Sequence, residues 1–359
     1  MRGKLPSLSC VALVGSFVPL VQGNALSHNA AVRERAINDF NFATGSGNCG
    51  NYMPKLGQWV PDIAVLADSA IKALDAMDDI FDPYLLDITF TLNNFLGIDS
   101  ADDIATARGW FSAVKSYSQG HFSDFGYSKA FMFCGDNYQV LKQGSDLAQE
   151  EDGTTVMVNG EEKRINEITD YVTELNSGFV PFWIKDLGGY LFAALERFRP
   201  GTPGDRCSSA FAFTSNPVKQ KSSISFCIYP STAAEGKKPI EYFAAETTTA
   251  ARALTFAGSL LDGDAPGSSI MMHEMFHATR GNGATNDHAK HTAQCTGAVI
   301  AGNKADAQES PQCAVLFAVA MDLMFAGGLD EIGDPKNVYW WRGQSMSHTG
   351  AVNELTKSA

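Results

Sequence analysis

Apolar residues recur three or four positions apart near the start of the chain, which predicts an amphipathic helix across "DIAVLADSAIKALDAMDDIF". A second helix is predicted over "ADDIATARGWFSAVKSYS", with Ser100 or Asp102 as its N-cap. "KAFMFCG" and "SSISFCIYP" are instead typical of strands, each with a cysteine near its end. The apolar positions of the first helix are Ile63, Leu66, Ala67, Ala70, Ile71, Leu74 and Met77.

The pattern changes between Cys134 and Cys207. An acidic loop, "QGSDLAQEEDG", precedes a predicted hairpin that turns at Asn159-Gly160, and the Pro/Gly-rich stretch "RFRPGTPGDRC" follows. We interpret residues 135–206, approximately, as an insertion. Helical patterns dominate from Pro239 onward, in "PIEYFAAETTTAARALTFAG", in a histidine-bearing segment and in "CAVLFAVAMDLMFA". The sequence therefore predicts an α+β domain that is mostly helical, with a small sheet.

The N-terminus has the pattern of a secretory signal peptide. Arg2 and Lys4 precede an apolar run and small residues, which predicts cleavage after Gly23 or Ala25 and a signal peptide over residues 1–23. A membrane anchor is the alternative, but the run is short and contains Pro19. Residues 24–48 form a short segment, below the roughly 40 residues that an independently folded domain needs. This segment, or the insertion, is a candidate for covering a site.

Composition and charge narrow the class of protein. The chain is 45% hydrophobic and 19% charged, which is typical of a globular protein. Its formal net charge of −13 excludes nucleic-acid binding and attachment to anionic membranes as main functions. After removal of Cys10 with the signal peptide, an even number of cysteines remains, so a secreted chain is expected to form three disulfides. These cysteines are Cys49, Cys134, Cys207, Cys227, Cys295 and Cys313.

The segment "HEMFH", residues 273–277, fits the pattern H-E-x-x-H. Pro266 and Gly267 precede it, Ser268 is a candidate N-cap, and Arg280 followed by Gly281 signals a helix end. On such a helix His273 and His277 lie one turn apart on one face, so both imidazoles can reach one metal ion. The pattern is also compatible with a chance match in a structural helix.

A zinc ion accepts imidazole nitrogen at about 2.0–2.1 Å, and a catalytic zinc needs a third protein ligand besides an open position. Glu274 is expected to act as general base on a zinc-bound water. The longer metzincin pattern fails, because Arg280 occupies its glycine position and Gly283 occupies its third histidine position. The Gly281-to-Gly283 turn lets the chain fold back. Candidate third ligands beyond it are Asp287, His288 and His291.

"HEMFHATRGNGATNDHAK" resembles the aspzincin metallopeptidases, the fungal secreted deuterolysin and peptidyl-Lys endopeptidase group. Their pattern is H-E-x-x-H followed by G-T-x-D-x-x-Y. Thr285-Asn286-Asp287 matches T-x-D, with Ala284 inserted after the glycine, so the resemblance implies Asp287 as the third zinc ligand. The family's tyrosine, which stabilises the transition state, is Lys290 here. A lysine can also donate to an oxyanion.

The order of other features extends this resemblance over about residues 49–326, including the Trp110-Phe111 segment and a strand that ends in a cysteine. It implies a zincin-like fold for residues 49–359. It also implies disulfides Cys49–Cys134 and Cys207–Cys227, whereas Cys295–Cys313 is expected from proximity alone. Asp322, in the apolar segment "AVAMDLMFA", corresponds to a family N-A-D segment that opens a helix. It is expected to be either a buried structural carboxylate or part of the substrate-binding pocket.

The expected function is therefore that of a secreted, monomeric, zinc-dependent endopeptidase with one zinc ion per chain. Its substrates would be extracellular proteins or peptides, and neither nucleic acid nor, after signal cleavage, a membrane is an expected partner. A secreted zinc-binding protein without turnover is the alternative, which Lys290 favours. Retention of Glu274 favours the enzyme, since zinc binding alone does not need that residue.

Overall fold

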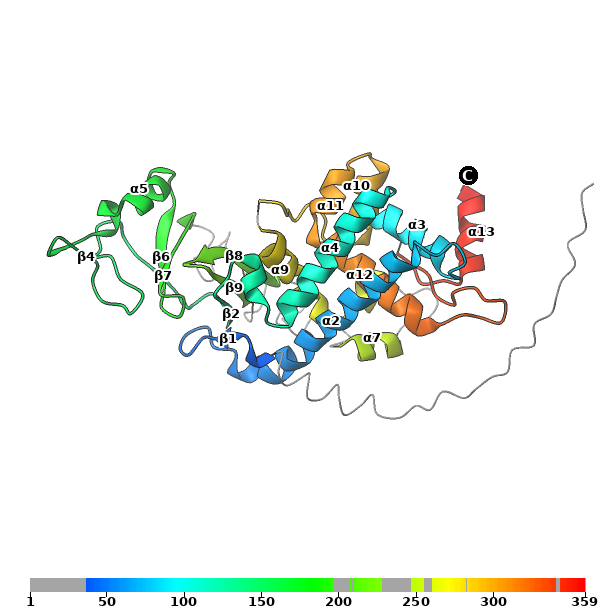
Figure 1. The fold of residues 1–359 in the computed structure, drawn as a ribbon, viewed down its shortest axis with the longest axis horizontal. Helices are drawn as coiled ribbons and strands as arrows, with labels where there is room; N and C mark the ends of the chain where they lie inside the picture. The colour runs from blue at the N-terminus through cyan, green and yellow to red at the C-terminus, as the bar shows by residue number, and fades with distance from the viewer. Residues whose placement is uncertain are drawn as a thin grey trace, which may run out of the picture.

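The structure is a computed structural model that describes residues 37–195, 207, 210–227, 247–254, 260–281, 283–339 and 343–358. The predicted signal peptide and the start of the segment after it lie outside these residues. Helices and strands are mixed, the strands forming small sheets on one side of a larger group of helices (Figure 1). The predicted mixture of helix with a small sheet is confirmed.

Five helices build the main core. The first predicted helix is confirmed and begins earlier than expected, at Met53, because "MPKLGQWVP" continues the buried stripe through Leu56, Trp59 and Val60. The second is confirmed with Ser100 as its N-cap, whose hydroxyl accepts from the Asp103 N–H at 3.2 Å. The core helices are α2 (Met53–Ala76), α3 (Leu85–Leu96), α4 (Ala101–Ser118), α9 (Ser268–Arg280) and α12 (Pro311–Gly327).

Helix α12 is apolar on all sides, and its position explains this composition. It packs against α2, α3 and α9, and residues Cys313 to Met324 are all buried. No helix in the described part of the chain is long and apolar enough to cross a membrane. Shorter helices complete this side: α7 (Thr248–Leu254), α8 (Leu261–Asp264), α10 (Thr292–Ile300), α11 (Lys304–Glu309) and α13 (His348–Ser358), with 3-10 turns at Gly50–Tyr52 and Phe122–Phe125. A further 3-10 turn, Ile165–Glu167, belongs to the residues after Cys134.

The main sheet has the strand order β1-β2-β9-β8. Strand β2 pairs in parallel with β9 and with β1, whereas β8 pairs antiparallel to β9 and forms an edge of this described sheet. The two predicted strands are the central pair. Phe40 is buried beside them, so residues before Cys49 contribute to the same fold. The strands are β1 (Asn41–Phe42), β2 (Lys129–Cys134), β8 (Ala212–Val218) and β9 (Lys221–Phe226).

The residues after Cys134 form a second small sheet, which lies at the left end of the molecule in Figure 1. The predicted hairpin is confirmed, with Asn159 and Gly160 at φ 54° and 83°, the positive values that a tight two-residue turn requires. A small core of Ala148, Ile165, Trp183 and Tyr190 stabilises this part. Its elements are β3 (Gln139–Leu141), β4 (Met157–Val158), β5 (Glu161–Glu162), α5 (Thr169–Asn176), β6 (Val180–Ile184) and β7 (Gly189–Ala193).

All three expected disulfides are present. Cys49–Cys134 joins the approach to α2 to the end of β2, and Cys207–Cys227 lies beyond β9. Cys295–Cys313 ties α10 to α12, with 5.6 Å between the two Cα atoms. All six cysteines are buried, so each bond is part of the folded interior.

Helix α7 is the described part of the helix predicted over residues 239–258; the remainder lies outside the described residues. Two buried carboxylates hold it. Asp62 accepts from the Thr248 N–H at 2.8 Å and from the Thr248 hydroxyl at 3.1 Å. Asp322 accepts from Arg252 Nε at 2.9 Å and also from Arg252 Nη2. The ends of α7 are thereby fixed to α2 and α12.

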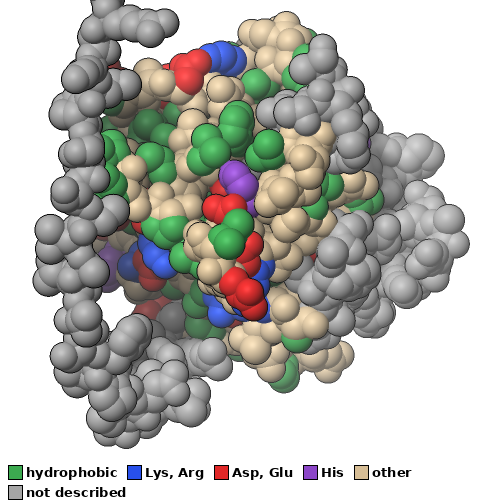
Figure 2. All heavy atoms as spheres, turned by 90° about the vertical axis from the view of Figure 1, so that its right-hand side faces the viewer, with side chains coloured by type: hydrophobic (Ala, Val, Ile, Leu, Met, Phe, Trp, Pro, Cys, Tyr) green, Lys and Arg blue, Asp and Glu red, His purple; other side chains and the backbone are tan. Residues whose placement is uncertain are grey.

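One face of the molecule is shown in Figure 2, on the side of α13. Acidic and basic side chains are scattered there among hydrophobic and uncharged groups, and the described side chains of this face form no continuous basic surface. The pattern agrees with the negative net charge of the chain.

Candidate metal centre

Helix α9 carries the H-E-x-x-H residues, and its ends are set by glycines. Gly267 is the N-cap, so the prediction that Ser268 caps the helix is wrong: Ser268 is the first helical residue and its side chain makes no capping bond. A Cβ on Gly267 would lie 2.7 Å from Trp59 Cζ2, so only glycine allows this approach of α9 to α2. Gly281, at φ 82°, ends the helix as expected.

Three predicted ligands meet beside α9. His273 Nε2 lies 3.0 Å from Asp287 Oδ1, and His277 Nε2 lies 3.1 Å from the same oxygen. Within the described residues, these three form the one group of three or more histidine, cysteine or carboxylate side chains whose donor atoms all lie within 4.8 Å of one another. The histidine side chains are largely buried, whereas Asp287 is exposed. The turn after α9 therefore returns Asp287 to the histidines, as the sequence predicted.

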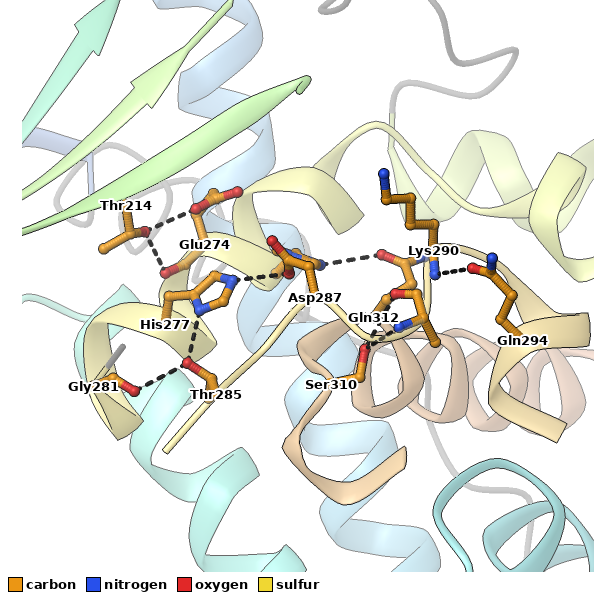
Figure 3. Close-up of polar contacts among 12 residues, drawn as sticks. Thr214, Glu274, His277, Gly281, Thr285, Asp287, Lys290, Gln294, Ser310 and Gln312 are labelled. Atoms are coloured by element: carbon orange, nitrogen blue, oxygen red, sulfur yellow. Dashed lines mark hydrogen bonds and ion pairs between the residues drawn. The ribbon is translucent and has the colours of Figure 1, made fainter. Parts of the chain in front are cut away.

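The loop that bears Asp287 is held on both sides by the junction of α11 and α12. The Asn286 N–H donates to the Glu309 carbonyl at 3.1 Å. The Ser310 hydroxyl donates to the Ala289 carbonyl at 3.1 Å, and the Ala289 N–H donates back to it at 3.4 Å. These bonds position a carboxylate that no regular element carries (Figure 3).

The second ring nitrogen of His277 is also bonded. Its Nδ1 lies 2.7 Å from the Thr285 hydroxyl, and that hydroxyl lies 3.0 Å from the Gly281 carbonyl (Figure 3). The Gly281 carbonyl can only accept a hydrogen bond, so the single proton of the Thr285 hydroxyl is donated to it. The hydroxyl oxygen must therefore accept its other hydrogen bond from His277 Nδ1–H. In a neutral ring this arrangement leaves Nε2 without a proton, as a metal ligand requires.

His273 is oriented in the same way by α12. Its Nδ1 lies 3.2 Å from Gln312 Oε1, so Nδ1–H donates to the amide oxygen and the lone pair on Nε2 faces Asp287. Each ligand histidine thus has an outer partner that fixes its ring and tautomer. Gln312 follows Pro311 in the first turn of α12, next to the Cys295–Cys313 disulfide.

The donor set fits a cation. Two imidazole lone pairs and one carboxylate oxygen are all acceptors, and such groups converge only where a positive charge lies between them. Two nitrogen donors and one oxygen donor are the ligand types of a catalytic zinc site. When the two rings are protonated instead, their hydrogen bonds to Asp287 hold the pKa of this carboxyl far below its usual range. Burial lowers the pKa of His273, but Asp287 and the charge of Glu274 outweigh burial and raise it.

A zinc ion held by these residues would bind more weakly as the pH falls. Protons compete with the metal for the Nε2 lone pairs, and the raised pKa of His273 makes this competition begin at a higher pH than for an ordinary histidine. Zinc affinity measured against a competing chelator should decrease steadily from about pH 8 to about pH 5, with proton release on binding. An affinity that stays constant over this range would contradict the histidine ligands.

Glu274 points from α9 toward the edge of the main sheet. Glu274 is 4% exposed. The hydroxyl of Thr214, on β8, lies 2.9 Å from Glu274 Oε2 and 2.9 Å from the main-chain oxygen of Glu274. Figure 3 shows this contact on the side of Glu274 that faces β8. Glu274 thus lies beside the ligand cluster without joining it.

A cavity of about 680 Å³ opens beside the cluster. His273, Glu274 and Asp287 line it together with the chain leading into β8 at Phe211 and Ala212. No residue of the described part of the insertion, 135–195, lines this cavity, so those residues do not cover it. The rest of the lining is Ala210, Asp262, Ala265, Ser269, Ile270, Ala289, Lys290, His291 and Gln312.

The other candidate residues lie outside the cluster. His288 is directed toward Asp306 and Glu309, at 4.0 and 3.5 Å, and His291 is the N-cap of α10. Lys290 lines the same cavity as His273 and Glu274, and its main-chain N–H donates to the Gln294 side chain at 2.6 Å (Figure 3).

Asp322 is 2% exposed and does not line the cavity. Arg252 engages both carboxylate oxygens, and Ser69 donates to Oδ1 at 2.9 Å. This geometry favours the structural alternative over a role in the substrate pocket, because both oxygens are occupied in the interior.

Sequence reasoning missed the roles of Gln312 and Thr214 and assigned no bond to Thr285. Gln312 and Thr214 lie far from the motif along the chain and belong to no pattern with it. Thr285 was part of the matched T-x-D segment, and this was the one available signal for an outer partner.

Comparison of the chain with models of known protein families, with curated proteins and with solved structures finds no match.

Proposed function

We propose that the protein is a secreted zinc endopeptidase of zincin-like fold, related to the aspzincins that its motif resembles. One observation carries this proposal: His273, His277 and Asp287 converge on one point, and both histidines are held by outer partners that leave Nε2 for a metal. A buried carboxylate, Glu274, lies beside them on the wall of a cavity.

A bound zinc ion would supply a Lewis acid that polarises the scissile carbonyl and lowers the pKa of water. The chain's residues do the remaining work. His273, His277 and Asp287 would hold the ion, and His273 and Asp287 also line the cavity. Glu274 takes the proton of the attacking water and passes it to the leaving amine. Its burial keeps this proton away from bulk solvent.

A peptide is the substrate class that the surroundings favour. Strand β8 is an edge of the described main sheet, and its first residue, Ala212, lines the cavity. An edge strand has backbone N–H and C=O groups that can pair with an extended peptide. The mostly small or apolar wall of Ala210, Ala265, Ile270 and Ala289 suits a side chain of that peptide.

Secretion is proposed on separate grounds. The signal-peptide pattern at residues 1–23 implies export. Three buried disulfides form and persist in oxidising compartments, which agrees with an extracellular protein.

The function is tested with purified protein loaded with one equivalent of zinc and a denatured protein as substrate. New peptide N-termini should appear, a chelator should abolish their formation, and added zinc should restore it. Mass spectrometry of the products distinguishes internal cleavage from removal of terminal residues. Cleavage that persists in the chelator would point to a contaminating or metal-independent protease.

A zinc-binding protein without turnover is the second candidate. Lys290 favours it, because a lysine stands at the position of the family's tyrosine. In that case the protein would bind one zinc ion through the same three ligands, and no protein substrate would yield new N-termini.

A further inference from the structure

We propose that Thr214 is a positioning residue for Glu274: its hydroxyl fixes the carboxylate of the general base against β8 and leaves the second carboxylate oxygen for the reaction. This inference rests on the proposed function and adds to it a residue outside the motif. Its basis is the contact between the Thr214 hydroxyl and Glu274 Oε2, at 2.9 Å.

Strand β8 places Thr214 with little freedom. Thr214 pairs with Ile224 of β9, and residues on either side of it along β8 continue the same antiparallel register. Side chains alternate along a strand, and Phe213 packs in the core beside the second sheet, whereas Ala212 packs in the helical core. Thr214 therefore faces α9, and it is 8% exposed.

The hydroxyl reaches two acceptors on one residue. Besides Oε2, the main-chain oxygen of Glu274 lies 2.9 Å from Thr214 Oγ1. The two acceptors share the single hydroxyl proton. The hydroxyl therefore fixes the position of the carboxylate relative to the helix that carries His273 and His277. Thr285 and Gln312 fix the rings of the ligands in a comparable way.

A glutamate side chain has three rotatable bonds, and proton transfer requires the carboxylate within hydrogen-bond reach of the water. Holding Oε2 restricts these bonds before substrate arrives. Among described residues, the structure gives Oε1 no hydrogen bond, and Figure 3 shows it on the side away from Thr214. The second oxygen is thus the one left for the water. Loss of the hydroxyl should therefore reduce kcat without weakening zinc binding.

The test compares Thr214→Val, which removes the hydroxyl at nearly constant volume, with Thr214→Ser, which keeps it. Thr248→Val is the matched control, because Thr248 is also buried and donates to a carboxylate, Asp62, in a contact away from the cavity. Measured quantities are kcat, KM, zinc stoichiometry and the Glu274 side chain in crystal structures of wild type and the variants.

For Thr214→Val, we expect kcat to fall roughly tenfold to a hundredfold, as for the loss of one hydrogen bond to a charged group, with KM and zinc content near wild type. Thr214→Ser and Thr248→Val should keep kcat within about threefold of wild type. In crystals, Glu274 should hold one rotamer in wild type and Thr214→Ser, and several in Thr214→Val.

Wild-type kcat in Thr214→Val, or an equal loss in Thr214→Ser, would overturn the proposal. If Thr214→Val does not fold, Thr214→Ala is compared with Thr214→Ser by the same criteria. A wild-type protein without peptidase activity would refute the proposed function alone. The rotamer of Glu274 in the crystals would then still decide whether Thr214 positions it, since a single rotamer in Thr214→Val contradicts the proposal.

Discussion

Replacement of Glu274 by glutamine is expected to slow peptide hydrolysis by roughly 10²- to 10⁴-fold, the usual contribution of a general base. Glutamine keeps the size of the side chain and can still contact Thr214, but its amide cannot take a proton from water. Glu274 lies outside the ligand cluster, so the variant should keep one zinc ion per chain. The measurement is kcat/KM on an unfolded protein substrate, together with metal analysis.

Glu161→Gln provides the control, because Glu161 is an exposed carboxylate in the distant β4–β5 hairpin. It should be indistinguishable from wild type. Activity of Glu274→Gln within tenfold of wild type would show that another group accepts the proton. Loss of zinc from Glu274→Gln would instead show that this carboxylate supports the metal centre.

The largest effect on metal binding is expected from loss of a ligand. His273→Ala combined with His277→Ala should remove stoichiometric zinc, because Asp287 alone offers one exposed oxygen donor. Thr285→Val provides a graded comparison: it removes the outer partner of His277 and should weaken zinc affinity roughly 10- to 100-fold. Zinc is measured by elemental analysis after dialysis and by competition with a chelator.

Undiminished zinc in the double variant would place the metal elsewhere. Equal affinities of Thr285→Val and wild type would show that the bond from His277 Nδ1 does not orient the ring. His291→Ala is a suitable control, since His291 borders the cavity but lies at the N-cap of α10, outside the ligand cluster. Its zinc affinity should equal that of wild type.

Local patterns along the sequence predicted the elements whose signals are local. The apolar spacing around Ile63 and Leu66 predicted α2, and Gly281 marked the end of α9, whereas the N-cap of α9 is Gly267 and not the predicted Ser268. The Asn159-Gly160 turn gave the hairpin. The glycine-rich turn after α9 predicted that the chain folds back toward the helix. It left Asp287, His288 and His291 as candidate ligands, and only the resemblance singled out Asp287.

Contacts between distant segments were not predictable in this way. The parallel pairing of β2 with β9 joins residues about ninety positions apart, and no periodicity along the chain encodes a partner. Gln312 contacts His273 only because α12 begins beside α9. Thr214 contacts Glu274 only because β8 lies along α9. The bidentate contact of Arg252 with Asp322 likewise joins two segments that are far apart along the chain.

Anomalous diffraction from crystals of the zinc-loaded protein, measured on both sides of the zinc absorption edge, tests the metal centre most directly. A single strong peak is expected between His273 Nε2, His277 Nε2 and Asp287, about 2.0–2.2 Å from each ligand atom, with a fourth position open to the cavity. A protein crystallised with excess zinc that shows no peak at these three residues, or a peak held by other side chains, would contradict the account.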